Sequence, residues 1–410
     1  MRAQRSSTIG LACAGGVIEG ALYEIGALNA IEEAVEGIGL HELDVYVGVS
    51  SGGLISSFLA NGVPASTLSR AIISRAESAL NVEPDVMFTP ALGEYAKRLW
   101  RFPRALASTL GQYVRHPGDL SAFGLLMNLG AAMPTGIFDN EPLQQYLARA
   151  FSTGGRTNDF RRLNAALRIV AMHLDSAEVA CFGEPGLDDV PISKAIQAST
   201  ALPGLYCPVE INNRLYIDGV ARRTVHASVA LDEGADLVFC INPIVPVNVQ
   251  LDHQIEQLWG SSLAENGLPS VLSQTFRAIV DSRKRTGFKK YAHTHPHADL
   301  ILIEPKYEET RLFFSNIFSF SNRHDVAEMA YQATREHLLE RADTIGPKLE
   351  RHGLHLDTDA LTDADRTLFG TIEADEPPAP SRTTFYEDTD HVLQRLDRMI
   401  ERVATETAMG

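Results

Sequence analysis

The sequence has little of what marks several large classes of protein. Basic residues are outnumbered by acidic ones, 36 Lys and Arg against 52 Asp and Glu, which gives a formal net charge of −16. Phosphate binding needs a basic face, so this balance argues against nucleic acid as the main partner. No unbroken apolar stretch comes near the roughly twenty residues of a membrane-spanning helix, so we expect none. The 410 residues can form one large α/β domain with additions, or two domains.

Cysteine is also scarce, and its spacing matches neither Cys-x-x-Cys nor a Cys-His metal site. Each cysteine lies in or beside an apolar run typical of a strand. We therefore expect reduced core residues and a reducing, cytoplasmic compartment for Cys13, Cys181, Cys207 and Cys240. Residues 1–7 are basic, but the apolar run after them is interrupted by glycines and meets Glu19. This pattern predicts a first strand and not a signal peptide.

Residues 44–53 are the most informative part of the chain. An apolar, β-branched run ends there in Gly-x-Ser-x-Gly, and a helical pattern follows over residues 54–60. Strand, sharp turn and helix in this order predict a nucleophile elbow with Ser50 at its apex. We expect glycine at Gly48 and Gly52 because a side chain in this strained turn would collide with neighbouring backbone.

A glycine-rich loop follows the first expected strand, residues 8–14. Gly15-Gly16-Val17-Ile18-Glu19-Gly20 leads into apolar residues at helical spacing over residues 21–35. Backbone N–H groups at such a helix start suit a phosphate or a developing oxyanion equally well. One strand precedes this loop and about one helix separates it from Ser50. That is too little chain for an α/β-hydrolase sheet, in which several elements precede the serine.

Later segments complete a pattern with the loop and the elbow. After strand-like runs at residues 167–172 and 179–183 and a helical run at residues 192–199 come Ser199-Thr200-Ala201-Leu202-Pro203-Gly204 and then Asp218-Gly219. In this order over residues 8–245, the motifs resemble those of the patatin-like phospholipase family. The glycine loop departs twice from the family's Gly-Gly-Gly-x-Arg/Lys-Gly. Val17 replaces the third glycine, and Glu19 stands where a basic residue is common.

The resemblance implies a serine lipid acyl hydrolase with a Ser50–Asp218 dyad. A serine hydroxyl needs a base during attack, and here Asp218 would accept the proton directly. Free aspartate is a weak base, so we expect the site to raise its pKa by desolvation. The N–H groups of Gly15, Gly16 and Val17 would hold the oxyanion on an acyl-enzyme route. Substrates would be phospholipid or lysophospholipid esters at a membrane surface, with no cofactor and no metal implied.

Other functional interpretations stay open. Asp236 with His226 or His253 could complete a Ser-Asp-His triad. An alcohol in place of water would turn the same acyl-enzyme into an acyltransferase. The departures at Val17 and Glu19 also allow a lipid-binding scaffold with a silent site.

The resemblance also implies a three-layer α/β/α fold with a mainly parallel central sheet, an inserted helical cap and a helical C-terminal extension. We expect the catalytic core over residues 8–245, with the cap at residues 83–150 because that stretch is long for a connection. Within the cap, residues 95–104 mix aromatic with basic side chains and residues 123–133 are mostly apolar. These stretches could meet lipid headgroups, cover an acyl-chain pocket, or simply pack as helices.

Beyond the core, we expect a mainly helical extension over residues 246–370 with a late strand near residues 299–303. Prolines among charges predict a linker over residues 371–384, and an apolar stripe predicts an amphipathic helix over residues 385–410.

Two polar tracts lie in the expected extension. The basic clusters at residues 283–285 and 289–290 indicate an exposed helix face, with anionic lipid as the alternative contact. The alternating histidines of residues 293–297 resemble a metal tract, but a solvated turn before the next strand is the simpler interpretation.

Overall fold

The computed structural model describes residues 7–73, 84–100, 130, 133–222, 225–248, 262–306 and 323–373. The chain divides into two compact units, residues 1–371 and 372–410. Apart from the last residues of the final helix, every element described below belongs to the first unit. The expected C-terminal helix over residues 385–410, most of the expected linker, and the apolar residues 123–129 lie outside the described residues.

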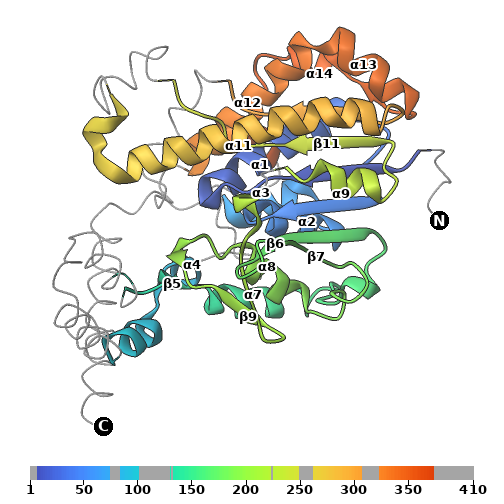
Figure 1. Ribbon diagram of the computed structural model, residues 1–410. Helices are drawn as coiled ribbons and strands as arrows, with labels where there is room; N and C mark the ends of the chain where they lie inside the picture. The colour runs from blue at the N-terminus through green and yellow to red at the C-terminus, as the bar shows by residue number, and fades with distance from the viewer. Residues whose placement is uncertain are drawn as a thin grey trace. The chain divides into compact units, whose positions relative to one another are not determined.

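A central sheet organises the first unit. Its described strands run in the order β12-β11-β1-β3-β6-β10-β9, and β7 also pairs with β6 (Figure 1). Neighbours from β12 to β6 are parallel, whereas β7, β9 and β10 are antiparallel additions. The mainly parallel sheet predicted from the sequence is therefore confirmed. The strands are β1 Ile9–Cys13, β3 Val45–Val49, β6 Ala166–His173, β7 Val179–Phe182, β9 Val209–Ile211, β10 Arg214–Asp218, β11 Leu237–Ile241 and β12 Asp299–Ile303.

Helices cover both faces of this sheet, which gives the predicted α/β/α layers. On one face, alternate strand residues such as Val47 and Val238 pack against α9 (Ala227–Asp232) and α11 (Gly267–Thr294). Figure 1 shows α11 as a long helix that runs alongside β11. The opposite face meets α2 (Ser51–Ala60), where Gly53 lies against Ile169. Beside α2 pack α1 (Val17–Ala34) and α8 (Ile192–Ser199).

The C-terminal extension is built into the same unit as the core. Strand β12 extends the sheet beyond β11, and α12 (Arg323–Glu340) packs along α1. The two helix backbones approach closely at Gly26, where an added Cβ would lie 2.2 Å from the carbonyl oxygen of Ala327. Helix α1 is accordingly buried on nearly all sides, and its buried residues include the polar Glu19, Glu24 and Asn29.

Smaller elements complete the described chain. Within the segment expected as a helical cap, β4 (Thr89–Pro90) follows α4 (Pro84–Met87) and pairs with β5 (Gly136–Asp139), which precedes α7 (Glu141–Ala150). Strand β5 also pairs with β8 (Gly204–Tyr206). Three-residue and four-residue 3-10 turns occur at Phe160–Arg162, Gly219–Ala221 and Leu263–Asn266. The remaining elements are β2 Val35–Glu36, α3 Ala65–Ile72, α4 Pro84–Met87, β4 Thr89–Pro90, β5 Gly136–Asp139, α7 Glu141–Ala150, β8 Gly204–Tyr206, α13 Ala342–Arg351, β13 His355–Leu356, α14 Thr358–Thr362 and α15 Leu368–Glu373.

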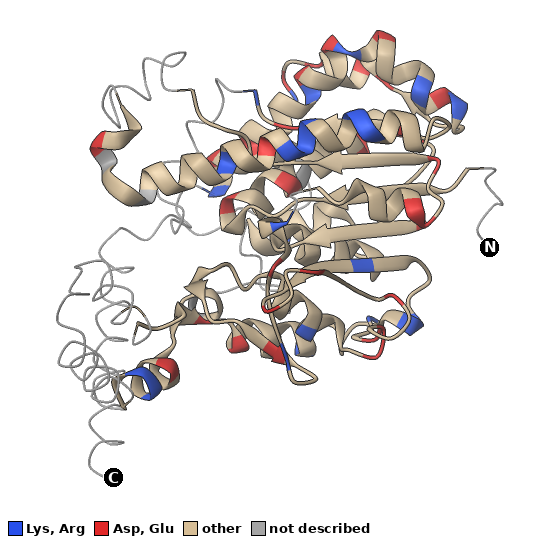
Figure 2. Cartoon of the chain, in the orientation of Figure 1, with Lys and Arg blue, Asp and Glu red and all other residues tan. Residues whose placement is uncertain are grey.

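The charged residues of α11 depart in part from the exposed face predicted for them. Figure 2 shows several Lys and Arg segments along this helix. Arg283, Arg285 and both lysines at residues 289–290 are exposed as predicted. Lys284 is buried instead, and its ammonium group pairs with Asp281 at 2.9 Å and with Glu304. The prediction is therefore wrong for Lys284.

The cysteines, the apolar character of the helices and the arrangement of metal-binding side chains can be described for the residues named above. All four cysteines are free thiols; Cys207 is partly exposed, and the other three are buried in strands. No described helix combines the length and the apolar character that crossing a membrane requires. In the same residues, no group of three metal-binding side chains comes together, and His295 lies 3.5 Å from Asp232.

Candidate active site

Ser50 occupies a strained turn between β3 and α2. Its backbone angles are φ 53° and ψ −123°, a conformation that residues other than glycine rarely adopt. A Cβ on Gly48 would lie 2.4 Å from the carbonyl oxygen of Gly52, and a Cβ on Gly52 would lie 2.3 Å from that of Ala14. These approaches confirm why the elbow needs glycine on both sides of the serine.

Hydrogen bonds from other segments hold this turn. The Gly52 N–H donates to the carbonyl oxygen of Ala14 at 3.1 Å, which ties the start of α2 to the end of β1. The Ser50 N–H donates to Oγ of Ser199 at 2.8 Å. The Ser199 hydroxyl in turn donates to the carbonyl oxygen of Val170 at 2.6 Å. Sequence reasoning gave Ser199 no role, although its place at the head of the Ser-x-Ala-x-Pro-Gly segment was a signal.

The pairing of the strands brings Asp218 close to Ser50. Val49 of β3 is opposite Val170 of β6, and Asp218 of β10 is opposite the next residue of β6, Ala171. Because β7 occupies the other edge of β6 at these residues, the ends of β3 and β10 meet along one edge of β6, and Ser50 and Asp218 emerge next to each other. The next residue is Gly219, where a Cβ would lie 2.5 Å from the Val170 carbonyl oxygen, so glycine permits this close approach.

The carboxyl group of Asp218 is buried, with 1% of the residue exposed. Burial raises its pKa from 3.8 to about 7, because removal from water disfavours the charged form. The Val220 N–H donates to this carboxyl group at 2.9 Å, and that hydrogen bond and the neighbouring Ser50 side chain act in the opposite direction. The expected rise in the pKa of Asp218 by desolvation is thus present.

The glycine loop lies directly against Ser50. A Cβ on Gly15 would sit 2.8 Å from the Cβ of Ser50, so glycine lets the loop approach the elbow. Helix α1 begins at Val17 with Gly16 as its N-cap, and the described residues supply no side-chain cap there. The first N–H groups of a helix lack partners within it, so they can receive an anion. Val17 has φ 57°, a strained value for a β-branched residue.

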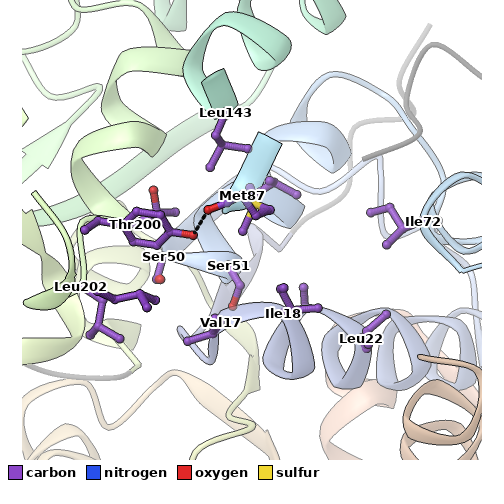
Figure 3. A pocket seen from close by; sticks show the side chains of 14 residues that line it. Val17, Ile18, Leu22, Ser50, Ser51, Ile72, Met87, Leu143, Thr200 and Leu202 are labelled. Carbon is purple, nitrogen blue, oxygen red and sulfur yellow. Dashed lines mark hydrogen bonds between the residues drawn. The ribbon is translucent and has the colours of Figure 1, made fainter. Parts of the chain in front are cut away.

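An apolar cavity opens on one side of Ser50 (Figure 3). The Tyr206 hydroxyl donates to the carbonyl oxygen of Met87 at 2.8 Å and so ties β8 to α4 at the cavity wall. Such a lining suits a hydrocarbon chain. Its apolar side chains are Val17, Ile18, Ala21, Leu22, Leu54, Ile72, Met87, Leu143, Leu202 and Leu205.

A second cavity shares Ser50 with the first but differs in chemistry. It is lined by Asp218 and by two further charged residues, Glu19 from α1 and Arg277 from α11. Glu19 is 5% exposed, and burial raises its pKa from 4.5 to about 7 while the charge of Arg277 opposes this shift. Sequence reasoning did not place Arg277 at the site.

The alternative triad through Asp236 is not assembled. Asp236 precedes β11, and its carboxylate accepts a hydrogen bond from the Thr8 N–H at 2.8 Å. Since β1, β3 and β11 are parallel, Asp236 lies at the edge of the sheet opposite to Ser50. His226 is buried at the start of α9, and His253 lies outside the described residues. The interpretation that used Asp236 is therefore wrong.

The sequence matches the patatin-like phospholipase family over residues 11–231. Among solved structures it is similar to VipD from Legionella pneumophila, with 12% identity, a TM-score of 0.31, and coverage of 89% of this chain and 81% of that one. The type III effector protein ExoU gives 16% identity and a TM-score of 0.33, with coverage of 82% and 53%. In the ExoU-SpcU complex of Pseudomonas aeruginosa, the matched chain gives 15% identity, a TM-score of 0.28, and coverage of 97% and 61%. This chain thus spans little more than half of the ExoU chains.

The family match covers more than half of the sequence and includes the loop, the elbow and Asp218, so the chain belongs to the patatin-like phospholipase family.

Proposed function

We propose that this protein is a lipid acyl hydrolase of the phospholipase A or lysophospholipase type, with Ser50 as nucleophile and Asp218 as its base. The observation that carries the proposal is that Ser50 lines one cavity with the buried carboxyl group of Asp218, whose pKa burial raises to about 7. A base with a pKa near the working pH can accept a proton and also return it. Family membership supports a lipid substrate.

In the acylation step, Oγ of Ser50 bonds to the ester carbonyl carbon while its proton passes to Asp218. The carbonyl oxygen becomes an oxyanion, which the N–H groups of Gly15, Gly16 and Val17 would stabilise. When this intermediate collapses, the bond to the leaving alcohol breaks and Asp218 returns the proton to that alcohol. An acyl group remains on Ser50.

In the second step, water takes the place of the alcohol. Asp218 accepts a proton from the water as its oxygen attacks the acyl carbon, and the bond to Oγ breaks with return of the proton to Ser50. A fatty acid leaves. An alcohol acceptor would follow the same path and give acyl transfer, so product analysis with added glycerol distinguishes the two outcomes.

The two cavities suggest how the substrate is oriented. The apolar cavity would take the acyl chain, since burial of hydrocarbon there is favourable at about 25 cal/mol per Å². The ester would then lie at Ser50, with the alcohol portion in the cavity that contains Asp218. This orientation places the leaving oxygen next to the group that returns its proton.

Exposed apolar side chains support contact with a membrane surface. Leu99 and Trp100, in the helical residues 92–100, are 75% and 77% exposed. The Tyr95 hydroxyl donates to the carbonyl oxygen of Ile137 at 2.8 Å, which ties this helical segment to β5. The double change of Leu99 and Trp100 to Asp should weaken co-sedimentation with liposomes, whereas Leu339→Asp on α12 should not. Equal binding by both variants would contradict this contact.

The catalytic proposal is tested by incubating the protein with mixed membrane lipids and measuring released fatty acids. Ser50→Ala and Asp218→Asn should each lower the rate by a factor on the order of 10³ or more. Ser57→Ala is the matched control, because this buried serine of α2 donates to the Gly53 carbonyl oxygen and lies outside the site. Near-full activity of Asp218→Asn would show that the dyad is wrong.

A fluorophosphonate probe tests the scaffold alternative independently of the choice of lipid. Wild-type protein should be labelled at Ser50, because an activated serine attacks the phosphorus and an unactivated one does not. Absence of labelling in folded wild-type protein would favour a silent lipid-binding site.

A further inference from the structure

Helix α11 brings a cation into the site from outside the segment that matches the family. That match ends at residue 231, whereas α11 covers Gly267–Thr294. Arg277 of this helix lines the same cavity as Ser50 and Asp218. One guanidinium nitrogen donates to the carbonyl oxygen of Val245 at 3.2 Å, which fixes where the side chain lies. The guanidinium group is thus held at the catalytic cavity.

The surroundings of Arg277 make a charge there costly. Much of the rest of the cavity is apolar, with Val220, Ile244 and Phe276 among its lining residues. Desolvation accordingly lowers the pKa of Arg277, while the carboxyl group of Glu19 opposes that effect. If the opposite charges of Glu19 and Arg277 served only to attach α11, apolar side chains could replace them at little or no cost in stability. A positive charge in this mostly apolar cavity, beside the proposed nucleophile, is better explained by an anionic ligand.

The position of the cavity indicates which part of a substrate Arg277 would meet. An acyl chain in the apolar cavity leaves the alcohol portion of the ester on the side of Asp218. Arg277 lines that side and is absent from the lining of the acyl cavity. A guanidinium group offers five N–H donors in a planar fork that matches phosphate oxygens.

We propose that Arg277 determines specificity by binding a phosphate in the leaving group, so that acyl esters of phosphate-bearing glycerol are preferred to neutral acylglycerols. This inference rests on the proposed function, because it needs an ester at Ser50. Glu19 then acts as the internal counter-ion of Arg277 when no phosphate is bound. A charged Glu19 repels the phosphate, so the two residues influence this preference in opposite directions.

The test compares two substrates with the same acyl chain, a 1-acyl-lysophosphatidylglycerol and the corresponding 1-monoacylglycerol. Both are supplied as monomers, so that binding to a lipid surface does not enter. The measured quantity is the ratio of their kcat/KM values. Arg277→Gln should lower this ratio about tenfold or more, mainly through KM of the phospholipid, because a charge-assisted hydrogen bond is lost. Arg277→Lys should lower it less.

Glu19→Gln tests the direction of the effect. It removes the carboxylate that competes with the phosphate for Arg277, so it should raise the ratio of the kcat/KM values. If the two charges had only a structural role, Glu19→Gln and Arg277→Gln would each lower stability and the activity on both substrates. Lys289→Gln is the matched control, since it removes an exposed positive charge from the same helix and should leave the ratio at the wild-type value.

The outcomes separate the two proposals. If wild-type protein hydrolyses neither substrate, the proposed function is wrong. If it hydrolyses both and the ratio is unchanged in Arg277→Gln, the function stands and the assignment of Arg277 is wrong. Should Arg277→Gln fail to fold, Arg277→Lys and Glu19→Gln decide, and an unchanged ratio in both overturns the inference.

Discussion

The hydroxyl oxygen of Ser199 accepts a hydrogen bond from the backbone N–H of Ser50 at 2.8 Å. The same hydroxyl donates to the carbonyl oxygen of Val170 at 2.6 Å, so one side chain links the elbow to β6. All three groups are buried. Ser199 therefore holds the backbone of Ser50, the proposed nucleophile, and its loss would leave a buried N–H and a buried C=O without this partner.

We expect Ser199→Ala to lower both stability and nucleophile reactivity. Leaving buried polar groups unsatisfied costs about 1–3 kcal/mol, which urea denaturation would measure. Ser193→Ala on the same helix is the control, because that buried hydroxyl accepts hydrogen bonds from Gln144 at 3.1 Å and Asn158 at 3.0 Å. At a temperature where both variants are folded, fluorophosphonate labelling of Ser50 should slow in Ser199→Ala alone. Equal labelling rates would contradict a positioning role.

The raised pKa of Asp218 predicts that stability falls as pH rises. The unfolded chain releases this proton near pH 3.8 and the folded protein near pH 7, so between these values the folded state binds more protons. The free energy of unfolding therefore decreases through this window, by roughly 4 kcal/mol at most. Glu19, whose pKa is also raised to about 7, contributes with the same sign.

Asp218→Asn should accordingly be more stable than wild type at about pH 8 and similar to it at about pH 4. Its activity should be lost, because the buried carboxylate that destabilises the folded state at high pH is also the proposed base. Denaturation curves at both pH values check the prediction, with the exposed Asp175→Asn as control. A variant less stable than wild type at the higher pH would show that the Asp218 carboxyl is not destabilising there.

Adjacent glycines at the start of α2 should respond oppositely to alanine. A Cβ on Gly52 would lie 2.3 Å from the carbonyl oxygen of Ala14, whereas the nearest atom to a Cβ on Gly53 is 3.5 Å away. We expect Gly52→Ala to cost roughly 3 kcal/mol or more, since backbone must move. Gly53→Ala should be neutral or stabilising by up to about 1 kcal/mol, because alanine favours helix. Thermal unfolding measures both, and similar effects of the two changes would contradict this account.

The elbow and the start of α1 could be predicted from the sequence because their signals are local. A strand-like run, a turn and a helical run follow one another within a few residues, and the glycines have steric reasons that the structure confirms. The place of Asp218 could be predicted only from the order of the motifs, because its position beside Ser50 depends on β3 and β10 meeting along one edge of β6.

The second cavity could not be predicted in this way. Arg277 comes to line the same cavity as Ser50 through the packing of α11 on the sheet, which a run of helical residues does not encode. Lys284 illustrates the same limit. Arg283, Lys284 and Arg285 point about 100° apart around the helix, and the charged run alone does not say which of them faces the protein. The packing of α11 turns Lys284 inward, where Asp281 and Glu304 are its partners.

Val17 provides a test of strain in the glycine loop. Its φ of 57° places a β-branched side chain in the left-handed region, which costs about 1–2 kcal/mol relative to ordinary backbone. Val17→Gly relieves this strain and should stabilise the protein by about 1 kcal/mol, even though glycine loses more backbone freedom on folding. Val17→Ala is the control, since it removes the apolar branch but keeps a Cβ. If alanine and glycine change the free energy of unfolding equally, side-chain contacts and not backbone strain dominate at this position.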